Sequence, residues 1–579
     1  IQHDTYDPVL VLKGDMTIHS SAVWIESSAT AITFSPTGTG TFTNNGGLDN
    51  LGVVSITGGT STPQLLLASG MNAETISVAS SHIFNAGGAY TITIYGTSGV
   101  LFTNNGTFTP STSTVLYNGD GTAILNSGSI TFYDLTFSPE LSTNKTYNFD
   151  SGTIVVSDDL TISPTSTFVN NMALSVVLSS GITVTDRTII NPSSTAYGLL
   201  YTNAGFLTSG SINLQHARAT LDTTDGGTIT LTDSSGTPFT ITAGTFNNPD
   251  STVIFTGNGT MTLSSGVTSF QELEFSPTIT ADRVYTLSTS AVTVAGSLMV
   301  NPTGSGGTYE LQVDMANTVD VNGTLTVKKA VTANAEWNTT GTNFALEAGK
   351  IDLLSGGTLT ANGSTITLTG ATVPFNLTGG AFSAGTSTVV FNANSAVNPL
   401  TAGAITFNNV TVNPVITADR SQQFTSGSTI SFTGDISIVP SASTTPREFT
   451  FNMGGIFSGG SGSDIDVNPS GTATAVFNTN VSNYAVTMRT ITIDASTTWE
   501  ANASTITLTG AVSMPFTDGG THNAGSATYV FNGDANVTVD DDTYGNLTLS
   551  PTLASVGRQY NTNSGATTTI NTNLLITPT

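Results

Sequence analysis

Apolar and polar residues alternate along most of this 579-residue chain, in short runs separated by Gly, Asn, Ser and Thr. The alternation is clear at 252–255 (TVIF) and at 366–369 (ITLT). Because successive side chains of a strand point to opposite faces, strict alternation predicts strands with one buried face. Apolar runs with helical spacing are absent from the sequence. We therefore predict an all-β fold.

The buried faces of these strands are expected to carry the large apolar side chains. Thr, Val and Ile suit pleated strands, and Gly and Asn suit the turns between them. The predicted core positions are Val253, Phe255, Phe270, Leu273, Phe275, Val389, Phe391, Val530 and Phe531.

The strand pattern recurs four times, with a period of about 138 residues. One box, GAFSAGTSTVVFNA in its third copy, begins at Gly106, Gly244, Gly380 and Gly520. Internal periodicity of this kind is typical of repeat architectures. The repeats divide the chain into an N-terminal segment with a divergent first repeat, three full repeats and a partial repeat: 1–105, 106–243, 244–379, 380–519 and 520–579.

A finer repeat lies inside the coarse one. YDLTFSP, ending at Pro139, recurs as DDLTISP, ending at Pro164, 25 residues later. Two similar strands one short step apart favour successive turns of a β-solenoid, in an elongated repetitive array. A string of tandem β-sandwich (Ig-like) domains is the alternative, because 138 is not a multiple of 25 and strand periodicity does not distinguish parallel from antiparallel pairing.

The two ends of the chain share one phase of the repeat. Residues 13–21 (KGDMTIHSS) match 433–441 (TGDISIVPS), and 572–579 match the same box. Such a piece can be continued head to tail by another copy, and contacts of this kind generate filaments. The residues predicted to join subunits are Val9, Val11, Met16, Ile18, Leu574 and Ile576.

Composition narrows the function classes. The formal net charge is −26, from 38 acidic and 12 basic residues, which excludes nucleic acid as a partner class. The sequence has no Cys, and no apolar run is long enough for a transmembrane helix. The chain begins at Ile1 rather than Met, from which we expect an exported protein whose signal peptide has been removed.

Candidate chemistry is sparse. The five His residues show no metal-ligand spacing, so a structural or surface role is expected of them. Acidic residues on Gly-rich turns suit Ca²⁺, a hard cation that takes oxygen ligands, although solvated turn aspartates are the alternative. The candidate Ca²⁺ ligands are Asp158, Asp159, Asp222, Asp225, Asp540 and Asp541.

Basic residues recur once per repeat, and this pattern indicates a structural role. An active site usually occurs once, whereas a residue present in every copy serves the repeat itself. We therefore predict that the protein is not an enzyme, with a β-helix polysaccharide lyase or hydrolase as a remote alternative. Asp282 with Arg283 and Asp419 with Arg420, in the tracts TADRVY and TADRSQ, are expected to form local turn contacts. The recurring bases are Lys145, Arg283, Arg420 and Arg558.

The phrases GAFSAGTSTVVFNA (380–393), FNNVTVNP (407–414) and STITLTG (364–370) resemble microbial extracellular β-strand-repeat surface proteins. The resemblance implies a β architecture and a place at the cell surface, and it carries no functional residues. We expect an extracellular structural protein, a filament subunit whose partner is another copy of itself. The alternative is a cell-surface adhesin or glycan-binding stalk, whose partners are glycans or other cells.

Overall fold

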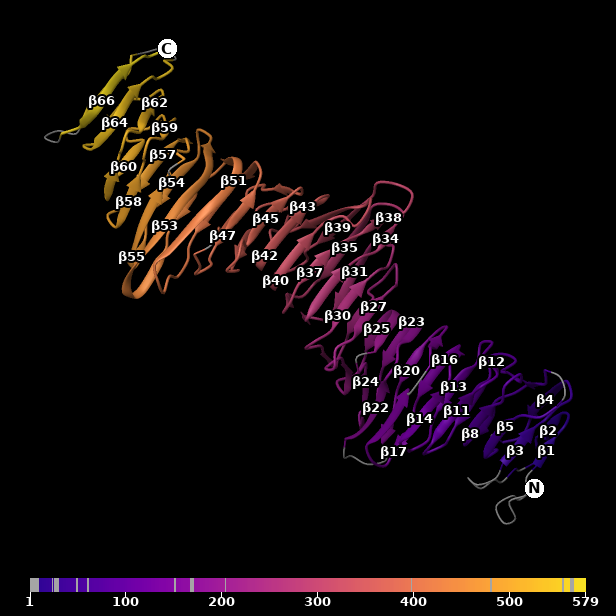
Figure 1. Ribbon diagram of the computed structural model, residues 1–579. Coiled ribbons are helices and arrows are strands. Elements are labelled where there is room, and N and C mark those ends of the chain that lie inside the picture. The colour runs from indigo at the N-terminus through magenta and orange to yellow at the C-terminus, as the bar shows by residue number, and fades with distance from the viewer. Residues whose placement is uncertain are drawn as a thin grey trace. The chain divides into compact units, whose positions relative to one another are not determined.

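The structure is a computed structural model. It describes residues 10–22, 24, 31–47, 50–59, 62–149, 152–166, 171–203, 205–396, 398–479, 482–553, 557–562 and 567–579. These residues form strands and no helix, and the strands stack in parallel as a β-solenoid of about 22 turns (Figure 1). No helix of the described chain is long and apolar enough to cross a membrane. The prediction of a β-solenoid is confirmed, and the alternative of antiparallel sandwich domains is wrong.

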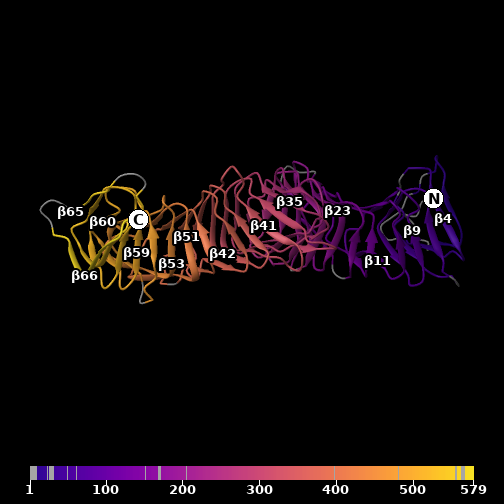
Figure 2. The same ribbon diagram turned by 90° about the horizontal axis from the view of Figure 1, so that it is seen from above.

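The chain divides into two compact units. One comprises Ile1–Pro277 with Ser288–Ser290, and the other comprises Thr278–Leu287 with Ala291–Thr579. Within each unit neighbouring strands lie side by side, as the second view also shows (Figure 2).

Each turn contributes strands to three faces. In the first unit one turn consists of β10 (Thr91–Ile94), β11 (Val100–Asn104) and β12 (Thr107–Thr109). In the next turn β13 (Thr114–Tyr117) pairs with β10 and β14 (Ala123–Ser127) pairs with β11, both in parallel. β10 and β11 therefore each hydrogen-bond to a strand of the previous turn and to a strand of the next turn, and β12 pairs with β9 (Ile83–Asn85) of the previous turn.

The finer sequence repeat is one turn of the solenoid. Leu135 in β16 (Asp134–Phe137) lies opposite Leu160 in β20 (Leu160–Ile162), 25 positions later. Leu547 in β64 (Thr543–Leu549) likewise lies opposite Leu574 in β66 (Thr569–Ile576). The predicted stacking of these proline-ended boxes is confirmed.

The coarse repeat is not a whole number of turns. In the first unit, five successive turns lead along one face from Val115 to Phe239. The box that contains Val115 recurs at Val253, 14 positions beyond Phe239, in a strand that pairs with β27 (Thr228–Leu231) on another face. The strands of the five turns are β13, β16, β20, β23 (Ile182–Ile190), β25 (Phe206–Leu214) and β28 (Phe239–Ile241), and the box recurs in β30 (Thr252–Phe255).

The coarse repeat has the same relation to the turns in the second unit. Five turns lead from Val389 to Phe516, and the same box recurs at Tyr529, 13 positions later, on another face. One sequence repeat therefore covers five turns and two of the three faces of a sixth, which explains why its length is not a multiple of 25. The strands are β47 (Thr388–Phe391), β50 (Asn409–Val412), β52 (Ile436–Ile438), β54 (Asp464–Val467), β57 (Thr490–Ile493), β60 (Phe516–Asp518) and β62 (Thr528–Phe531).

The core is built from inward side chains stacked turn upon turn. Phe451, Phe477 and Trp499 form one such column, with ring centroids 5.6 Å and 4.6 Å apart. Full burial of a large apolar side chain contributes roughly 1.5–3 kcal/mol, and here each column repeats that contribution at every turn.

Eight of the nine predicted core residues are buried, and Val530 is not. Val530 lies between Tyr529 and Phe531, which both point inward. Because side chains alternate along a strand, the predicted neighbours Val530 and Phe531 cannot share the buried face. The prediction for Val530 is therefore wrong, and Tyr529 takes the inward position.

Candidate functional site

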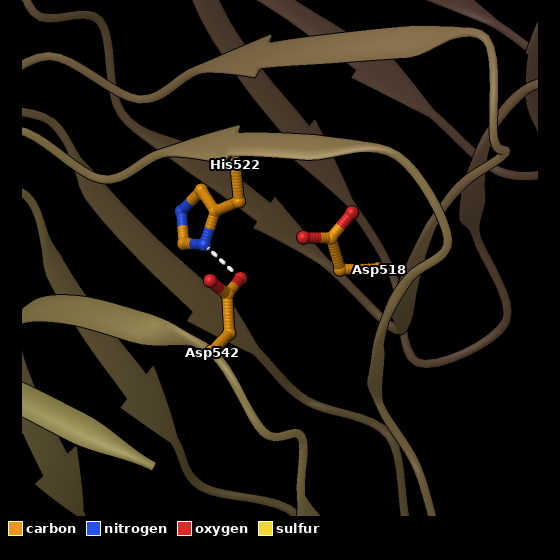
Figure 3. Close-up of side chains that lie close together, drawn as sticks. All are labelled: Asp518, His522 and Asp542. Atoms are coloured by element: carbon orange, nitrogen blue, oxygen red, sulfur yellow. Dashed lines mark hydrogen bonds and ion pairs between the residues drawn. The ribbon is translucent and has the colours of Figure 1, made fainter. Parts of the chain in front are cut away.

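Three side chains from separate strands converge in the second unit: Asp518, His522 and Asp542 (Figure 3). Asp518 ends β60, His522 is the middle residue of β61 (Thr521–Asn523), and Asp542 lies directly before β64. One donor atom of each residue lies within 4.8 Å of the others. We refer to these three residues as the His522 cluster.

The backbone around Asp518 fixes that carboxylate in place. Gly520 donates its N–H to the Asp518 carboxylate at 2.8 Å, and the Asp518 N–H donates to the Asp540 carboxylate at 2.9 Å. A side chain at Gly520 would meet the carbonyl oxygen of Thr497 at 2.3 Å, so the corner between β60 and β61 requires glycine. The turn therefore holds Asp518 beside the imidazole of the next strand.

The His522 imidazole is held at both nitrogens. Its Nδ1 contacts the Asp542 carboxylate, and its Nε2 lies 2.5 Å from the Tyr529 hydroxyl. The Trp499 indole N–H donates to that same hydroxyl at 3.0 Å. The His522 side chain is 0% exposed, whereas Asp542 keeps 14% exposure, so only the carboxylate side reaches solvent.

The electrostatics of the His522 cluster are dominated by negative charge. Burial, together with the charge of Asp542, raises the pKa of Asp518. The Tyr544 hydroxyl is buried and has no hydrogen-bond partner among the described residues. Burial, and then the charges of Asp542 and Asp540, raise the pKa of Tyr544.

This arrangement suits cation binding better than acid–base catalysis. Nε2 of the buried imidazole faces the Tyr529 hydroxyl and Nδ1 faces the Asp542 carboxylate, so neither nitrogen is open to a substrate from solvent. One imidazole nitrogen and two carboxylate oxygens are, however, ligands that divalent transition metals accept.

A second acidic cluster joins Asp158, Asp159 and Asp186 in the first unit. Two of its members, Asp158 and Asp159, are predicted Ca²⁺ ligands. Arg187 donates to the Asp159 carboxylate from Nε at 3.1 Å and from Nη2 at 2.5 Å. A guanidinium thus already supplies positive charge at this cluster.

The other predicted Ca²⁺ ligands lie apart. Asp222 ends β26 (Ala219–Asp222) and accepts from the Thr224 N–H at 2.9 Å. Asp222 and Asp225 line an open groove of about 420 Å³, and no third acid or His within metal-binding distance joins them in the described chain. Asp540 and Asp541 lie beside the His522 cluster, but it is Asp542 that belongs to it. Calcium at these residues stays a prediction.

Sequence reasoning missed His522, although the repeats contain a signal. The residue stands in the box GTHN, where the three earlier copies have Phe108, Phe246 and Phe382. Its partner Tyr529 stands where the third copy has Val389. Two apolar positions of the repeat therefore became polar together, in one copy.

The basic residues that recur in each repeat tie adjacent turns together. Lys145 pairs with Asp120 at 3.4 Å, and Arg558 pairs with Asp534 at 2.6 Å, each one turn earlier. Arg420 donates to the Asn394 side chain at 2.9 Å, again one turn earlier.

The acidic residues that precede Arg283 and Arg420 contact the next turn instead. Asp282 accepts the backbone N–H of Glu310 at 3.0 Å, and Asp419 accepts that of Glu448 at 3.1 Å. Both donors lie one turn later. These two hydrogen bonds join successive turns, and local turn contacts of Asp282 with Arg283 and of Asp419 with Arg420 stay a prediction.

Of the residues predicted to join subunits, Val9 lies outside the described residues. Val11 is half exposed in β1 (Leu10–Leu12). Met16 and Ile18 are mostly buried in β2 (Met16–Ile18), where they line an open apolar pocket of about 410 Å³.

At the other end of the chain, Leu574 is 53% exposed and Ile576 is 62% exposed. Both lie in β66, where Leu574 stacks on the buried Leu547 and Ile576 stacks on the buried Leu549. They therefore occupy core-facing positions that no described strand covers.

No protein family, curated protein or solved structure was found to match this chain.

Proposed function

We propose that this protein is an extracellular structural subunit that assembles end to end into a filament. The observation that carries the proposal is the pair Leu574 and Ile576. These side chains continue a buried column of the solenoid, yet more than half of each is exposed. A further parallel turn would bury them, and we propose that another copy supplies this turn.

The edge of β66 supports this proposal. The strand pairs with β64 on one side, and no register with a strand on its other side is found among the described residues. Its sequence, TINTNLLI, contains no charged residue and no Pro. Natural edge strands are usually protected from pairing by charges, Pro or a bulge. β66 has one bulge, between Ile570 and Asn573, and the regular stretch after it, which carries Leu574 and Ile576, favours addition of another strand.

The first turn offers a matching surface. Leu10, Leu12 and Trp24 line the pocket of about 410 Å³ together with Met16 and Ile18. The described residues that line this pocket include no Asp, Glu, Lys or Arg. We propose that β66 of one copy packs against this first turn of the next, which gives a heterologous contact that does not close on itself.

The test places lysine on opposite faces of β66. The double variant L574K/I576K places two charges on the core-facing side, whereas L575K places one on the outward side, where Leu575 is 51% exposed and stacks on Thr548. We expect filaments in negative-stain micrographs of the wild type and of L575K, and dispersed particles of L574K/I576K. Sedimentation of wild type as a monomer, or equal loss of assembly in L575K, would contradict the proposal.

The extracellular location rests on the resemblance to surface β-repeat proteins and on the low content of charged residues, 9%. Fractionation of the source cells, with antibody detection of the protein in intact cells, tests this part separately. Detection only after cell lysis would overturn it.

A glycan-binding adhesin is a second proposal, favoured by one groove. Tyr201, Asn203, Asp222, Thr224 and Asp225 line it with an aromatic ring and several hydrogen-bonding groups. Binding sites of this kind combine an apolar surface with a few polar groups that fix orientation. A glycan array probed with wild type and Tyr201→Ala tests it, and equal binding of the two would exclude this groove.

A further inference from the structure

The His522 cluster has the donor set of a metal centre. Its donors are the Nδ1 of His522 and one carboxylate oxygen each from Asp518 and Asp542, all within 4.8 Å of one another. Zinc binds imidazole nitrogen and carboxylate oxygen at about 2.0–2.2 Å, so donors of one ion lie within about 4 Å of each other. Small side-chain adjustments bring these three donors to such distances.

We propose that Asp518, His522 and Asp542 bind a divalent transition-metal ion, for which Zn²⁺ is the best match. Imidazole favours Zn²⁺ over Ca²⁺ and Mg²⁺, which take oxygen ligands almost exclusively. The site is therefore distinct in chemistry from the all-oxygen Ca²⁺ sites that turn aspartates suggest.

The ion-pair partner of Asp542 is His522, which carries a positive charge only when it is protonated. Among the described residues, no Lys or Arg forms an ion pair with Asp518 or Asp542. The other acidic cluster of the protein differs in this respect, because Arg187 pairs with Asp159. Two carboxylates that approach each other away from solvent are stabilised by a positive charge between them.

The surroundings of His522 orient the imidazole for a metal. Metal-binding imidazoles usually donate the N–H of the second nitrogen to a fixed acceptor. Here Nε2 faces the Tyr529 hydroxyl, whose oxygen also accepts from the Trp499 N–H. A phenolic oxygen has two acceptor sites, so it accepts from both donors at once. With the proton on Nε2, the lone pair of Nδ1 points at the carboxylates.

An independent observation is the unpartnered hydroxyl of Tyr544. This side chain is fully buried, its ring lies 5.9 Å from that of His522, and its hydroxyl has no hydrogen-bond partner among the described residues. Leaving a buried hydroxyl unpaired costs about 1–3 kcal/mol. A water molecule on the metal gives Tyr544 the missing partner.

Comparison of the repeats also indicates a specific role for His522 and Tyr529 in the fourth repeat. Where the third repeat has Phe382 and Val389, this copy has His522 and Tyr529, which are hydrogen-bonded to each other. Phe382 is half-buried and Val389 is fully buried, and exchanging such apolar residues for polar ones costs stability unless their groups are satisfied. The bound ion completes that set of interactions.

The test measures metal binding by the intact chain after treatment with EDTA. Calorimetric titration with Zn²⁺ is expected to give one ion per chain, and Co²⁺ is expected to give visible absorption bands of a nitrogen- and oxygen-ligated site. Asp518→Asn and Asp542→Asn each remove a ligand and should lower the Zn²⁺ affinity by more than about 100-fold. Tyr529→Phe removes the acceptor for Nε2 and should lower it by about 10- to 100-fold.

Asp541→Asn is the matched control, because it makes the same change of charge one position from Asp542 but lies outside the cluster. It should leave the Zn²⁺ affinity within about threefold of wild type, since it removes no ligand. Circular dichroism in EDTA checks that every variant keeps its β-structure.

Three results would overturn the proposal: no stoichiometric Zn²⁺ in folded wild type, an equal loss in Asp541→Asn, or tighter binding of Ca²⁺ than of Zn²⁺. None of these results tests filament formation, so the metal-site proposal and the filament proposal can be contradicted independently of each other.

Discussion

Ser387 carries a buried hydroxyl that the fold does not use. The residue precedes β47 at a corner of the solenoid, is fully buried, and its hydroxyl has no hydrogen-bond partner among the described residues. The equivalent corner of the fourth repeat has Ala527. The backbone turn is the same in both repeats. The backbone N–H of Ser387 donates to the Ala384 carbonyl, and the backbone N–H of Ala527 donates to the Ala524 carbonyl, each at 3.0 Å.

We expect Ser387→Ala to stabilise the turn around β47 by about 1 kcal/mol. A buried hydroxyl without a partner costs about 1–3 kcal/mol, and the small loss of packing on removing one oxygen offsets part of that gain. The equivalent Ser251 is different, because its hydroxyl is 2.9 Å from that of Thr223. Loss of this hydrogen bond should make Ser251→Ala destabilising by about 1 kcal/mol. The same substitution at equivalent corners should therefore have opposite signs.

Native-state hydrogen exchange of the intact chain is the suitable assay. A repeat protein of this length does not unfold in one two-state step, so local opening is more informative than a melting temperature. Each 1 kcal/mol changes the exchange rate about fivefold. Amides of β47 should exchange about fivefold more slowly in Ser387→Ala, and amides of β30 about fivefold faster in Ser251→Ala. Faster exchange in both variants would refute the reasoning.

Three further predictions concern charge and the stacked amides. Burial opposes ionisation of Asp464, but hydrogen bonds from Arg489 outweigh it and hold the pKa of Asp464 below its usual value. The stabilisation of the fold by the Asp464–Arg489 pair is therefore present above about pH 4 and is lost as the pH falls. The difference in melting temperature between wild type and Arg489→Met should shrink below that pH. Burial and the charge of Asp494 raise the pKa of Asp466, so the ionised carboxylate destabilises the fold at pH 7. Asp466→Asn should therefore raise the melting temperature at pH 7, and this gain should vanish below about pH 4. An unchanged melting temperature at pH 7 would count against this prediction. Asn362 donates to the side-chain amide oxygen of Asn338 at 2.8 Å and has a φ of 49°. Asn362→Ala should therefore lower the free energy of local opening by roughly 1–2 kcal/mol and speed hydrogen exchange. The effect should be larger than that of Asn362→Gly, because glycine adopts a positive φ without strain.

The spacing of the proline-ended boxes predicted the length of one turn, because Leu135 and Leu160 do face each other. The coarse period was harder to interpret from sequence. Val115 and Val253 have the same sequence context but lie on different faces of the solenoid. A sequence repeat records which residues are equivalent and does not record how far the chain has rotated between them.

The candidate sites show the same limit. Asp158 and Asp159 were predicted as calcium ligands, but the strand one turn later brings Arg187 against Asp159. The His522 cluster draws on three segments, and its sequence signal was a departure from the repeat rather than a motif. Only the stacking of turns places Asp542 beside the imidazole of His522.

The sequence by itself determined the strands, their buried faces and the length of a turn, since these depend on the local alternation of side chains and on spacing along the chain. The tertiary structure decided the parallel pairing, the rotation of each repeat about the solenoid and the partners of each charged side chain. Those features depend on hydrogen bonds and contacts between residues about 20 to 30 positions apart, and no local pattern specifies which atoms meet across that distance.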